Sequence, residues 1–475
     1  MFEKKHITFP KNYVYKSYVQ GKQNQKFKEF IYRNLKEFSY SPKIIIELGV
    51  GDGTLAETIA RALQPEIFYI VDLNDFFLKV SEKKTKTKQV IPIKKELTEI
   101  EPQDFEKPPE MVFTSNTLHW LPFNEKDDSW LKCAKRIYEI LTEGGFFFVH
   151  QGLKWTYFPL YDLAKELFER KYGTKINLSD YLYYPLRREA VENFKQVGFK
   201  VVSTEDFYEF EGFSASYSKD ELYKSFSVAG LNVFKCQIKD KREQKKFVKD
   251  FLLLCKTIKP PSFSHRGFFC LRKPLKEVKF KIIPPGNMSE KEYRALTNFL
   301  EEVSGEFIPP LNVRTPDDMD LRFSETLIDS SSENFSTKKS SVEIYAEVLA
   351  KKYWNIFAYT ELFSEEKTPS GIISFTIKNS YSYPGRKSVY ISTIAVRKKY
   401  RFLSIAERLL GFVIDLVKDS AEFKNAKISV IETRTWSTNQ ASKKLFKKAG
   451  FSNTLVLQNH RGEGIDTEYY CYILT

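Results

Sequence analysis

The chain has few cysteines, and their arrangement excludes two kinds of structural cross-link. Five cysteines are scattered over 475 residues, and none belongs to a Cys-x-x-Cys pair. A small, odd set of this kind indicates free thiols in a reducing compartment. It argues against a disulfide framework and against a structural zinc site. We therefore expect no metal centre, and we expect the protein to be cytoplasmic.

Long apolar runs and concentrated blocks of arginine are also missing. No stretch approaches the ~18 consecutive apolar residues of a membrane-spanning helix, and the opening residues have no apolar core of a secretory signal. We therefore expect no membrane partner. The formal net charge is nevertheless +14, which favours nucleic acid, acidic carrier proteins or phosphate-bearing cofactors. The alternative is an ordinary lysine-rich, solvated surface.

What the chain does have is enough apolar and aromatic material for two or three folded domains. Hydrophobic residues make up 42% of the chain and aromatic residues 15%, which is typical of globular proteins. Strands and helices alternate from Ile44 to Leu271, which indicates a parallel sheet covered on both faces, with a helical insertion at Asp220–Cys255. Near residue 276 the pattern restarts with a strand and the turn Pro284-Pro285-Gly286. We therefore predict two domains, residues 1–275 and 276–475.

A glycine-rich turn joins the first predicted strand to its helix. Glu47 stands near the end of that strand and is followed by Gly49-Val-Gly51-Asp-Gly53. Glycine permits a positive φ and lets a ligand approach the main chain closely. The second strand ends in Asp72, where an acid can accept both ribose hydroxyls of an adenosine. A nicotinamide-binding turn is the alternative, but it requires a glycine where Thr54 stands.

These features resemble the class I S-adenosylmethionine-dependent methyltransferases over residues 1–275. In that family the glycine loop passes beneath the methionine and ribose of the cofactor, so the resemblance implies S-adenosyl-L-methionine. The stretch after the third strand falls where the family contacts adenine, and the segment after the fourth strand lines the methyl-transfer pocket. The cofactor-binding residues implied by this resemblance are Glu47, Gly49, Gly51, Gly53, Asp72, Glu96 and Asn116.

The segment Ser115–Leu121 contains Asn-x-x-His-Trp, a form similar to that of methyltransferases acting on carboxylates, such as the trans-aconitate and malonyl-carrier-protein methyltransferases. A carboxylate is already charged, so positioning by a cationic clamp supplies most of the rate. Arg187 and Arg188 are candidates for this clamp, and the alternative is a pair of surface arginines opening a helix. His119 lines the predicted pocket, either as a hydrogen-bonding residue or as a general base for a hydroxyl or amine acceptor.

A second ligand-binding turn lies near the other end of the chain. Val396 to Ala406 joins a strand to a helix, and main-chain N–H groups at a helix N-terminus, with nearby cations, suit phosphate oxygens. A later helix ends at Gly450. Together these segments resemble the GNAT acyltransferases over residues 278–475, which implies acetyl-CoA or another acyl-CoA as cofactor. The residues that match the family's pyrophosphate loop and its pantetheine-binding position are Arg401, Ser404, Ala406 and Asn439.

Two positions depart from the GNAT pattern. Ser404 replaces a glycine of the pyrophosphate loop, where its hydroxyl could donate to the phosphate or crowd it. Phe446 stands where the family often has the tyrosine that protonates the leaving thiolate, and phenylalanine has no proton to donate. Tyr469, Tyr470 or water would then supply that proton. Glu432, at the predicted end of a strand, is a candidate base for an amine, and its alternative is a solvated strand-end acid.

Two signatures in one chain predict a bifunctional transferase. The predicted fold class is α/β, a doubly wound Rossmann-like methyltransferase sheet followed by a mixed α/β GNAT domain. The first half would methylate a small-molecule or carrier-protein-bound acid, and the second would transfer an acyl group from CoA to an amine. One alternative is an RNA- or protein-modifying methyltransferase with an accessory or inactive GNAT domain, although the Asn/Asp-Pro-Pro-Tyr/Phe pattern of many nucleic-acid methyltransferases is missing. Another is an interaction protein whose two folds are scaffolds.

Overall fold

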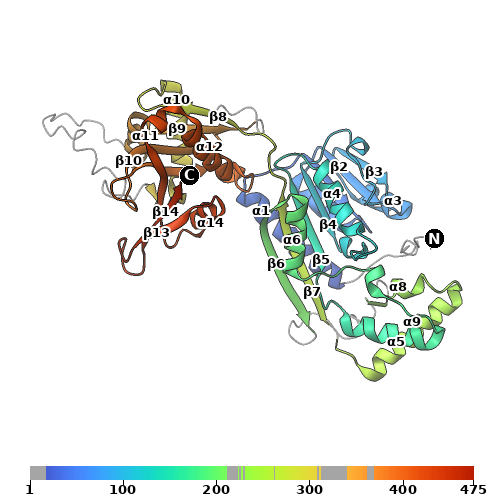
Figure 1. The fold of residues 1–475 in the computed structure, drawn as a ribbon. Helices are drawn as coiled ribbons and strands as arrows, with labels where there is room; N and C mark the ends of the chain where they lie inside the picture. The colour runs from blue at the N-terminus through green and yellow to red at the C-terminus, as the bar shows by residue number, and fades with distance from the viewer. Residues whose placement is uncertain are drawn as a thin grey trace. The chain divides into compact units, whose positions relative to one another are not determined.

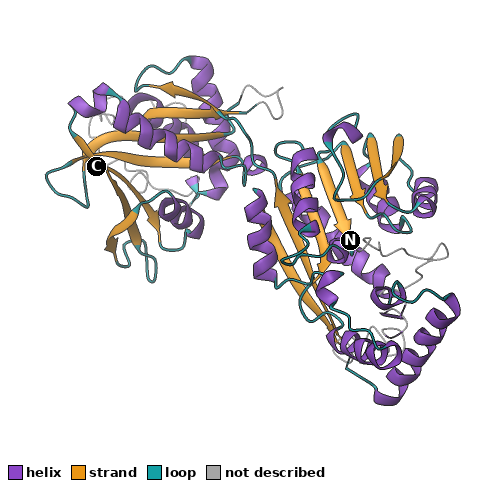
Figure 2. Cartoon of the chain, turned by 45° about the vertical axis from the view of Figure 1, so that its right-hand side comes forward, coloured by secondary structure: helices purple, strands orange, loops and turns teal. Residues whose placement is uncertain are grey.

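The structure is a computed structural model that describes residues 18–210, 223, 226–227, 230–261, 263–307, 310–311, 340–360 and 368–474. The chain divides into two compact units, Met1–Pro274 and Leu275–Thr475 (Figure 1). Each unit is built around its own seven-stranded sheet with helices packed against it (Figure 2). Both units are therefore α/β sheet domains, and each is described below by itself.

The sheet of the first unit has the strand order β3-β2-β1-β4-β5-β7-β6. Its neighbouring strands are parallel up to β5, but β7 runs antiparallel to both β5 and β6. The fully parallel sheet predicted from the sequence is therefore wrong at one strand, because β7 inserts between β5 and β6 in the reverse direction. The strands are β1 (Ile44–Leu48), β2 (Ile67–Asp72), β3 (Gln89–Lys94), β4 (Met111–Ser115), β5 (Phe146–Gly152), β6 (Lys200–Phe210) and β7 (Phe263–Arg272).

Alternate side chains of these strands enter two cores, because successive residues of a strand point to opposite faces of a sheet. On one face Ile46 and Phe147 pack with Trp130 of α4 and Phe194 of α6. On the other face the adjacent strand residues pack against α1, α2 and α3. The helices and short 3-10 turns around this sheet are α1 (Tyr18–Glu37), α2 (Thr54–Leu63), α3 (Asp75–Lys84), η1 (Pro102–Asp104), η2 (Leu118–Trp120), α4 (Ser129–Ile140), η3 (Leu178–Asp180) and α6 (Arg187–Val197).

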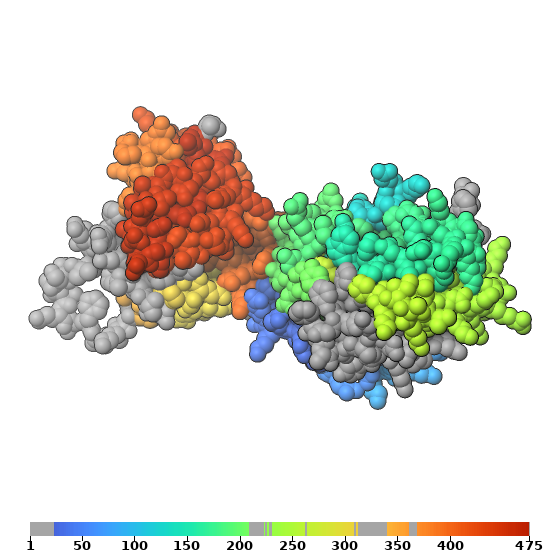
Figure 3. All heavy atoms as spheres, turned by 90° about the horizontal axis from the view of Figure 1, so that it is seen from below, coloured from blue at the N-terminus to red at the C-terminus, as the bar shows by residue number. Residues whose placement is uncertain are grey.

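Three further helices form a separate group beyond the carboxyl end of β5. They are α5 (Phe158–Tyr172), α8 (Asn232–Lys235) and α9 (Lys241–Ile258), and α5 packs against the other two (Figure 1). Aromatic and aliphatic residues such as Leu160, Phe234 and Phe247 make their shared core. The predicted insertion contains α8 and most of α9, while residues 211–222 lie outside the described chain. The outer side of α9 lies on the surface of this unit, coloured yellow-green in Figure 3.

The second unit has the strand order β13-β14-β12-β11-β10-β9-β8. Only β11 and β12 are parallel neighbours, and the other adjacent pairs are antiparallel. This is the mixed α/β arrangement expected from the sequence, with β13 as a strand that the sequence interpretation missed. The strands are β8 (Lys279–Ile283), β9 (Trp354–Tyr359), β10 (Gly371–Asn379), β11 (Lys387–Val396), β12 (Ile428–Trp436), β13 (Ser452–Leu457) and β14 (Thr467–Ile473).

Helices cover both faces of this second sheet. One core packs Phe375, Ile391 and Ile431 against α12, α13 and α14, and the other packs Phe357 and Ile372 against α10 and α11. The first turns of α10 and α11 are closed by capping boxes. The helices and turns of this unit are α10 (Glu290–Val303), η4 (Ser304–Glu306), α11 (Ser341–Lys352), η7 (Lys398–Tyr400), α12 (Ile405–Asp419), α13 (Ala421–Asn425) and α14 (Gln440–Lys448).

The parallel strands β11 and β12 separate toward their carboxyl ends. Their last paired residues are Ile391 and Thr433, whereas β11 continues to Val396 and β12 to Trp436. An extra residue of β11, Ser392, bulges at the point of separation, since Ile391 and Thr393 face consecutive residues of β10. Beyond the bulge each strand keeps only its outer partner. The predicted strand end at Glu432 is therefore wrong, because β12 runs four residues further.

Candidate functional sites

The glycine loop after β1 holds three glycines in the left-handed conformation. The φ angles are 70° at Gly49, 53° at Gly51 and 74° at Gly53. A Cβ added to Gly49 would meet Thr117 at 2.4 Å, and one added to Gly53 would meet Ser81 at 2.5 Å. A Cβ at Gly51 would meet nothing within 4 Å. The outer glycines are therefore required by packing, whereas the middle one faces open space of the kind a ligand would fill.

A buried and a partly buried carboxyl group lie beside this loop. Glu47 is 2% exposed, and its Oε2 has no hydrogen-bond partner. Burial, together with the charges of Asp52 and Asp72, raises the pKa of Glu47 well above its ordinary value. Asp72 accepts hydrogen bonds from the N–H groups of Gly51 (3.3 Å) and Asn74 (2.9 Å), yet burial still raises its pKa. This concentration of acidic groups suits a cationic ligand.

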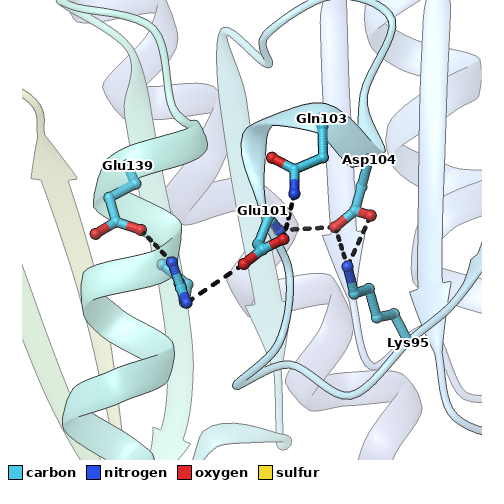
Figure 4. A network of polar contacts seen from close by, with 6 residues as sticks. Lys95, Glu101, Gln103, Asp104 and Glu139 are labelled. Carbon is cyan, nitrogen blue, oxygen red and sulfur yellow. Dashed lines mark hydrogen bonds and ion pairs between the residues drawn. The ribbon is translucent and has the colours of Figure 1, made fainter.

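The segment after β3 is held to α4 by a network of polar contacts (Figure 4). Lys95 donates to both carboxylate oxygens of Asp104 at 2.8 Å. Arg136 of α4 joins Glu139, at 2.9 Å, to Glu101, at 3.5 Å. These contacts fix the main chain on either side of Glu96, the residue predicted to lie near adenine. Glu96 itself is partly buried, and its role stays a prediction.

The segment after β4 connects the glycine loop to two buried histidines. Asn116 has a φ of 57°, unusual for a residue other than glycine, and its Nδ2 lies 3.5 Å from Oε1 of Gln23 in α1. The Oγ of Ser115 lies 2.9 Å from Nδ1 of His150. His119 stacks on Tyr184 with ring centroids 5.2 Å apart. Residues of β4, β5 and α1 thus meet at the carboxyl edge of the sheet.

His119 and His150 are both buried and neutral. Their exposed fractions are 4% and 0%, and burial, with the charge of Arg266, lowers the pKa of each well below its usual range. Three nitrogen atoms in this region have no hydrogen-bond partner: Nδ1 of His119, Nε2 of His150 and Nε2 of Gln151. Buried polar atoms are normally satisfied. A cluster of this kind therefore points to a polar ligand.

Arg266 is the residue that sequence reasoning missed. It is 6% exposed on β7 and pairs in register with Gly152 at the end of β5. Its Nη1 donates to Oδ1 of Asn116 at 2.8 Å, and its Nε donates to Ser264 at 2.6 Å. Because β7 is antiparallel, its first residues reach the same edge as the ends of β1, β4 and β5. The available signal was a basic pair, His265-Arg266, opening an otherwise apolar strand.

Arg187, the predicted carboxylate clamp, lies elsewhere in the described chain. It opens α6 with its side chain 49% exposed, and its Nη1 lies 2.8 Å from Asp206. Asp206 in turn contacts Nε2 of His265 at 3.3 Å. No contact between Arg187 and the glycine loop or the buried histidines is found among the described residues. The clamp role of Arg187 thus stays a prediction that these contacts do not support.

In the second unit, the N-terminus of α12 carries the predicted pyrophosphate loop. Ser404 is the N-cap residue with a φ of 64°, and its side chain makes no capping hydrogen bond. Ala406 lies in the first helical turn, where main-chain N–H groups lack helical partners. Arg401 precedes the helix and forms an ion pair with Glu306. Ser404 therefore adopts the backbone conformation that suits the glycine it replaces.

The other predicted residues of this unit lie along β12 and α14. Asn439 caps α14 by accepting a hydrogen bond from the N–H of Ser442 at 3.1 Å. Glu432 is fully buried and accepts from the N–H groups of Tyr381 (3.0 Å) and Ser382 (2.8 Å). The alternative of a solvated acid is therefore wrong. Glu432 holds the β10–β11 turn, and its proposed role as a base stays a prediction.

Phe446 is buried in the core beside Tyr470, with ring centroids 5.6 Å apart. The hydroxyl of Tyr470 donates to Glu468 at 2.6 Å, and burial with this neighbouring carboxylate raises the pKa of Tyr470 to about 12. Tyr470 thus keeps its proton at neutral pH. Tyr469 points to the other face of the sheet, where its ring lies 5.3 Å from that of Tyr381.

Comparison with known proteins finds a family match within each unit. Residues 46–149 match the methyltransferase domain family, and residues 324–451 match the acetyltransferase (GNAT) family. The chain therefore contains a methyltransferase domain and a GNAT acetyltransferase domain. No curated protein matches the chain.

Solved structures similar to the chain include examples of both kinds. N-methyltransferase NodS from Bradyrhizobium japonicum WM9, in complex with S-adenosyl-L-homocysteine, is 9% identical over 57% of this chain and 95% of its own, with a TM-score of 0.32. NAA60 from Arabidopsis thaliana, in complex with acetyl-CoA, is 13% identical over 42% of this chain and 100% of its own, with a TM-score of 0.28. The assignment of the two domains is carried by the family matches.

Three further findings concern metal ions, membrane-spanning helices and disulfides. Within the described residues, no three His, Cys, Asp or Glu side chains are close enough to hold a metal ion. None of the helices that the structure describes is long and apolar enough to cross a membrane. All five cysteines are free thiols.

Proposed function

We propose that the chain is a bifunctional transferase. Its first unit transfers a methyl group from S-adenosyl-L-methionine to a carboxylate of a small molecule or a carrier-bound acid. Its second unit transfers an acyl group from acetyl-CoA, or another acyl-CoA, to an amine. The single observation that carries the first half is the carboxyl edge of the sheet, where the glycine loop, the acids Glu47 and Asp72 and two neutral histidines lie together.

The residues of the glycine loop fit S-adenosyl-L-methionine. The open space over Gly51 leaves room for the cofactor, and the unpaired Oε2 of Glu47 offers an acceptor for its cationic part. Asp72 would accept the ribose hydroxyls. When bound, the cofactor supplies an electrophilic methyl group on a sulfonium. The protein's own contribution is to hold the acceptor in line and to exclude water.

Neutral histidines favour a carboxylate acceptor over an amine or a hydroxyl. The lowered pKa of His119 makes it a weak base, poorly matched to removing a proton from such a group. A carboxylate needs no deprotonation at neutral pH. His119 would instead orient the acceptor by donating a hydrogen bond.

The second unit has the parts of an acyl-CoA site. The first turn of α12 would bind the diphosphate through its main-chain N–H groups, with Arg401 released from Glu306 to add its charge. The separated ends of β11 and β12 leave main-chain groups of both strands available to a pantetheine arm. Asn439 stands beside this separation, at the start of α14.

The nature of the product tests the carboxylate assignment directly. Purified protein is incubated with a metabolite extract and S-adenosyl-L-methionine labelled on its methyl group. Methyl esters release labelled methanol in mild base, whereas N-methyl products keep the label. We expect base-labile products. Base-stable products alone would exclude carboxylate methylation, and a strongly salt-dependent affinity for tRNA would favour the RNA-modifying alternative.

A further inference from the structure

Arg266 is placed to act on the methyl acceptor. It lies at the end of β7 that shares the carboxyl edge of the sheet with His150, Gln151 and Gly152 of β5. Gly152 makes this approach feasible, since a Cβ there would meet Tyr184 at 2.4 Å and Nη1 of Arg266 at 3.4 Å. The guanidinium also lies 5.6 Å from the ring centre of Tyr157.

We propose that Arg266 binds the carboxylate of the methyl acceptor, with His119 and His150 as neutral hydrogen-bond donors beside it. The inference rests on the proposed methyltransferase function and names the residue that selects its substrate. A guanidinium presents several donors in a planar fork that matches a carboxylate. Asn116 fixes one arm of this fork through the 2.8 Å hydrogen bond to its Oδ1.

The charges at this edge divide into two groups. Glu47 and Asp72 lie beside the glycine loop on β1 and β2, where the cationic cofactor is expected. Arg266 lies on β7, on the far side of β4 and β5 in the strand order. A cation there attracts an anionic acceptor and repels an ammonium group. The field of Arg266 also helps to keep both histidines uncharged, as their lowered pKa values indicate.

The transfer itself then needs no base. One carboxylate oxygen forms the new O–CH3 bond with its own electron pair. The S–CH3 bond breaks, and its electron pair stays on sulfur. The products are a methyl ester and a neutral thioether, and no proton moves. The orphaned nitrogens of the two histidines hold the acceptor without having to titrate.

The test compares Arg266→Gln with Arg61→Gln, which makes the same change at an exposed arginine in the last turn of α2, at the opposite end of that helix from the glycine loop. Affinity for S-adenosyl-L-homocysteine is measured by calorimetry. Methyl transfer to straight-chain mono- and dicarboxylic acids of two to ten carbons is followed as base-labile label. We expect Arg266→Gln to raise KM at least about tenfold, the weight of a charged hydrogen bond, while its affinity for S-adenosyl-L-homocysteine stays within about twofold. Arg61→Gln should change neither quantity.

Arg266→Lys keeps the charge but loses the fork, so its KM should fall between those of wild type and Arg266→Gln. An unchanged KM in Arg266→Gln would overturn the inference. So would loss of cofactor affinity in both Arg266 variants, because the side chain would then support the fold. Failure of the wild type to methylate any of these acids while still binding S-adenosyl-L-homocysteine would also overturn it. If the wild type does not bind S-adenosyl-L-homocysteine at all, the proposed function itself fails.

Discussion

At the scale of single residues, the buried carboxyl group of Glu47 lowers the stability of the free protein but suits the binding of a cationic ligand. Its carboxyl group is buried, lacks one hydrogen-bond partner and lies near two other acids. Each of these features disfavours the charged form in the free protein. A cationic ligand would reverse that balance, so the same side chain that weakens the free protein strengthens the complex. Asp72, whose pKa is also raised, belongs to the same arrangement.

Glu47→Gln should therefore separate stability from binding. The folded-state pKa of Glu47 lies above its ordinary value of 4.5, so the folded protein binds this proton more tightly than the unfolded chain. Its contribution to stability is present below pH 4.5 and is lost as the pH rises through the folded-state pKa. At neutral pH the variant should unfold at a higher temperature than wild type, with affinity for S-adenosyl-L-homocysteine at least about tenfold weaker. Thermal unfolding across pH and calorimetry measure both effects, and lower stability of the variant at neutral pH would refute the assignment.

Gly51→Ala tests the open space over the glycine loop. Gly173, the C-cap of α5, is a matched control because it also has a positive φ, 67°, and an added Cβ there would meet no atom within 4 Å. Alanine at either position should cost roughly 1–2 kcal/mol of stability, the strain of the left-handed conformation. Only Gly51→Ala should weaken binding of S-adenosyl-L-homocysteine. Equal affinities for the two variants, measured by calorimetry, would mean that the space over Gly51 is not the cofactor site.

At the scale of elements, the start of α12 and the separation of β11 from β12 define the second site. Ser404, the N-cap residue of α12, has a left-handed conformation, and its side chain makes no capping hydrogen bond. The strands part at Ile391 and Thr433, next to the bulge at Ser392. The N-terminus of α12 and the separation of β11 from β12 lie in the same unit. A single substitution at the start of α12 can therefore test the proposed CoA site.

Ser404→Gly should relieve the strain at this helix start. The left-handed conformation costs a residue other than glycine about 1–2 kcal/mol, and the greater freedom of glycine in the unfolded chain offsets about 0.5–1 kcal/mol of that gain. We expect the second unit to be stabilised by up to about 1 kcal/mol with CoA affinity retained. Ser420→Gly is the control, since Ser420 has a φ of −72° and no strain to relieve. A loss of CoA affinity in Ser404→Gly would show instead that the serine hydroxyl is a phosphate ligand.

The elements also show which parts of the two sites the sequence could predict. The glycine loop and the turn before α12 that contains Ser404 were predictable because both depend on local sequence. Arg266 was not, because its position depends on the direction of β7, which a short apolar run does not encode. Glu432 was misplaced at a strand end for a related reason. Three of the four residues after it, Thr433, Arg434 and Thr435, are polar, and pairing with β14 keeps them in the strand.

At the scale of the whole molecule, the chain consists of two units, and each unit has hydrophobic cores of its own. The sequence predicted an α/β sheet in each half of the chain, and the domain limits of 1–275 and 276–475 stay a prediction. It could not predict the reversed strand of the first sheet or the edge strand β13 of the second. Both depend on pairings between segments distant in sequence.

Two separately folded units and two ligands predict two separable responses to heat. A ligand that binds only a folded unit stabilises that unit by about 2.7 kcal/mol at a concentration of 100 times its Kd. S-adenosyl-L-homocysteine should raise the unfolding temperature of one transition, and CoA that of another. Calorimetric scans of the full chain with each ligand alone check this expectation. A single transition raised equally by both ligands would contradict it.

The central claim is that one chain holds a site for S-adenosyl-L-methionine and another for acyl-CoA. Isothermal titration of the full-length protein with S-adenosyl-L-homocysteine and then with CoA tests it most directly, with Gly51→Ala and Ser404→Glu as site-specific controls. We predict one mole of each ligand bound per mole of chain, with binding of the first weakened in Gly51→Ala and binding of the second lost in Ser404→Glu. Absence of binding heat for either ligand in the wild type, with the protein folded, would contradict the account for that half of the chain.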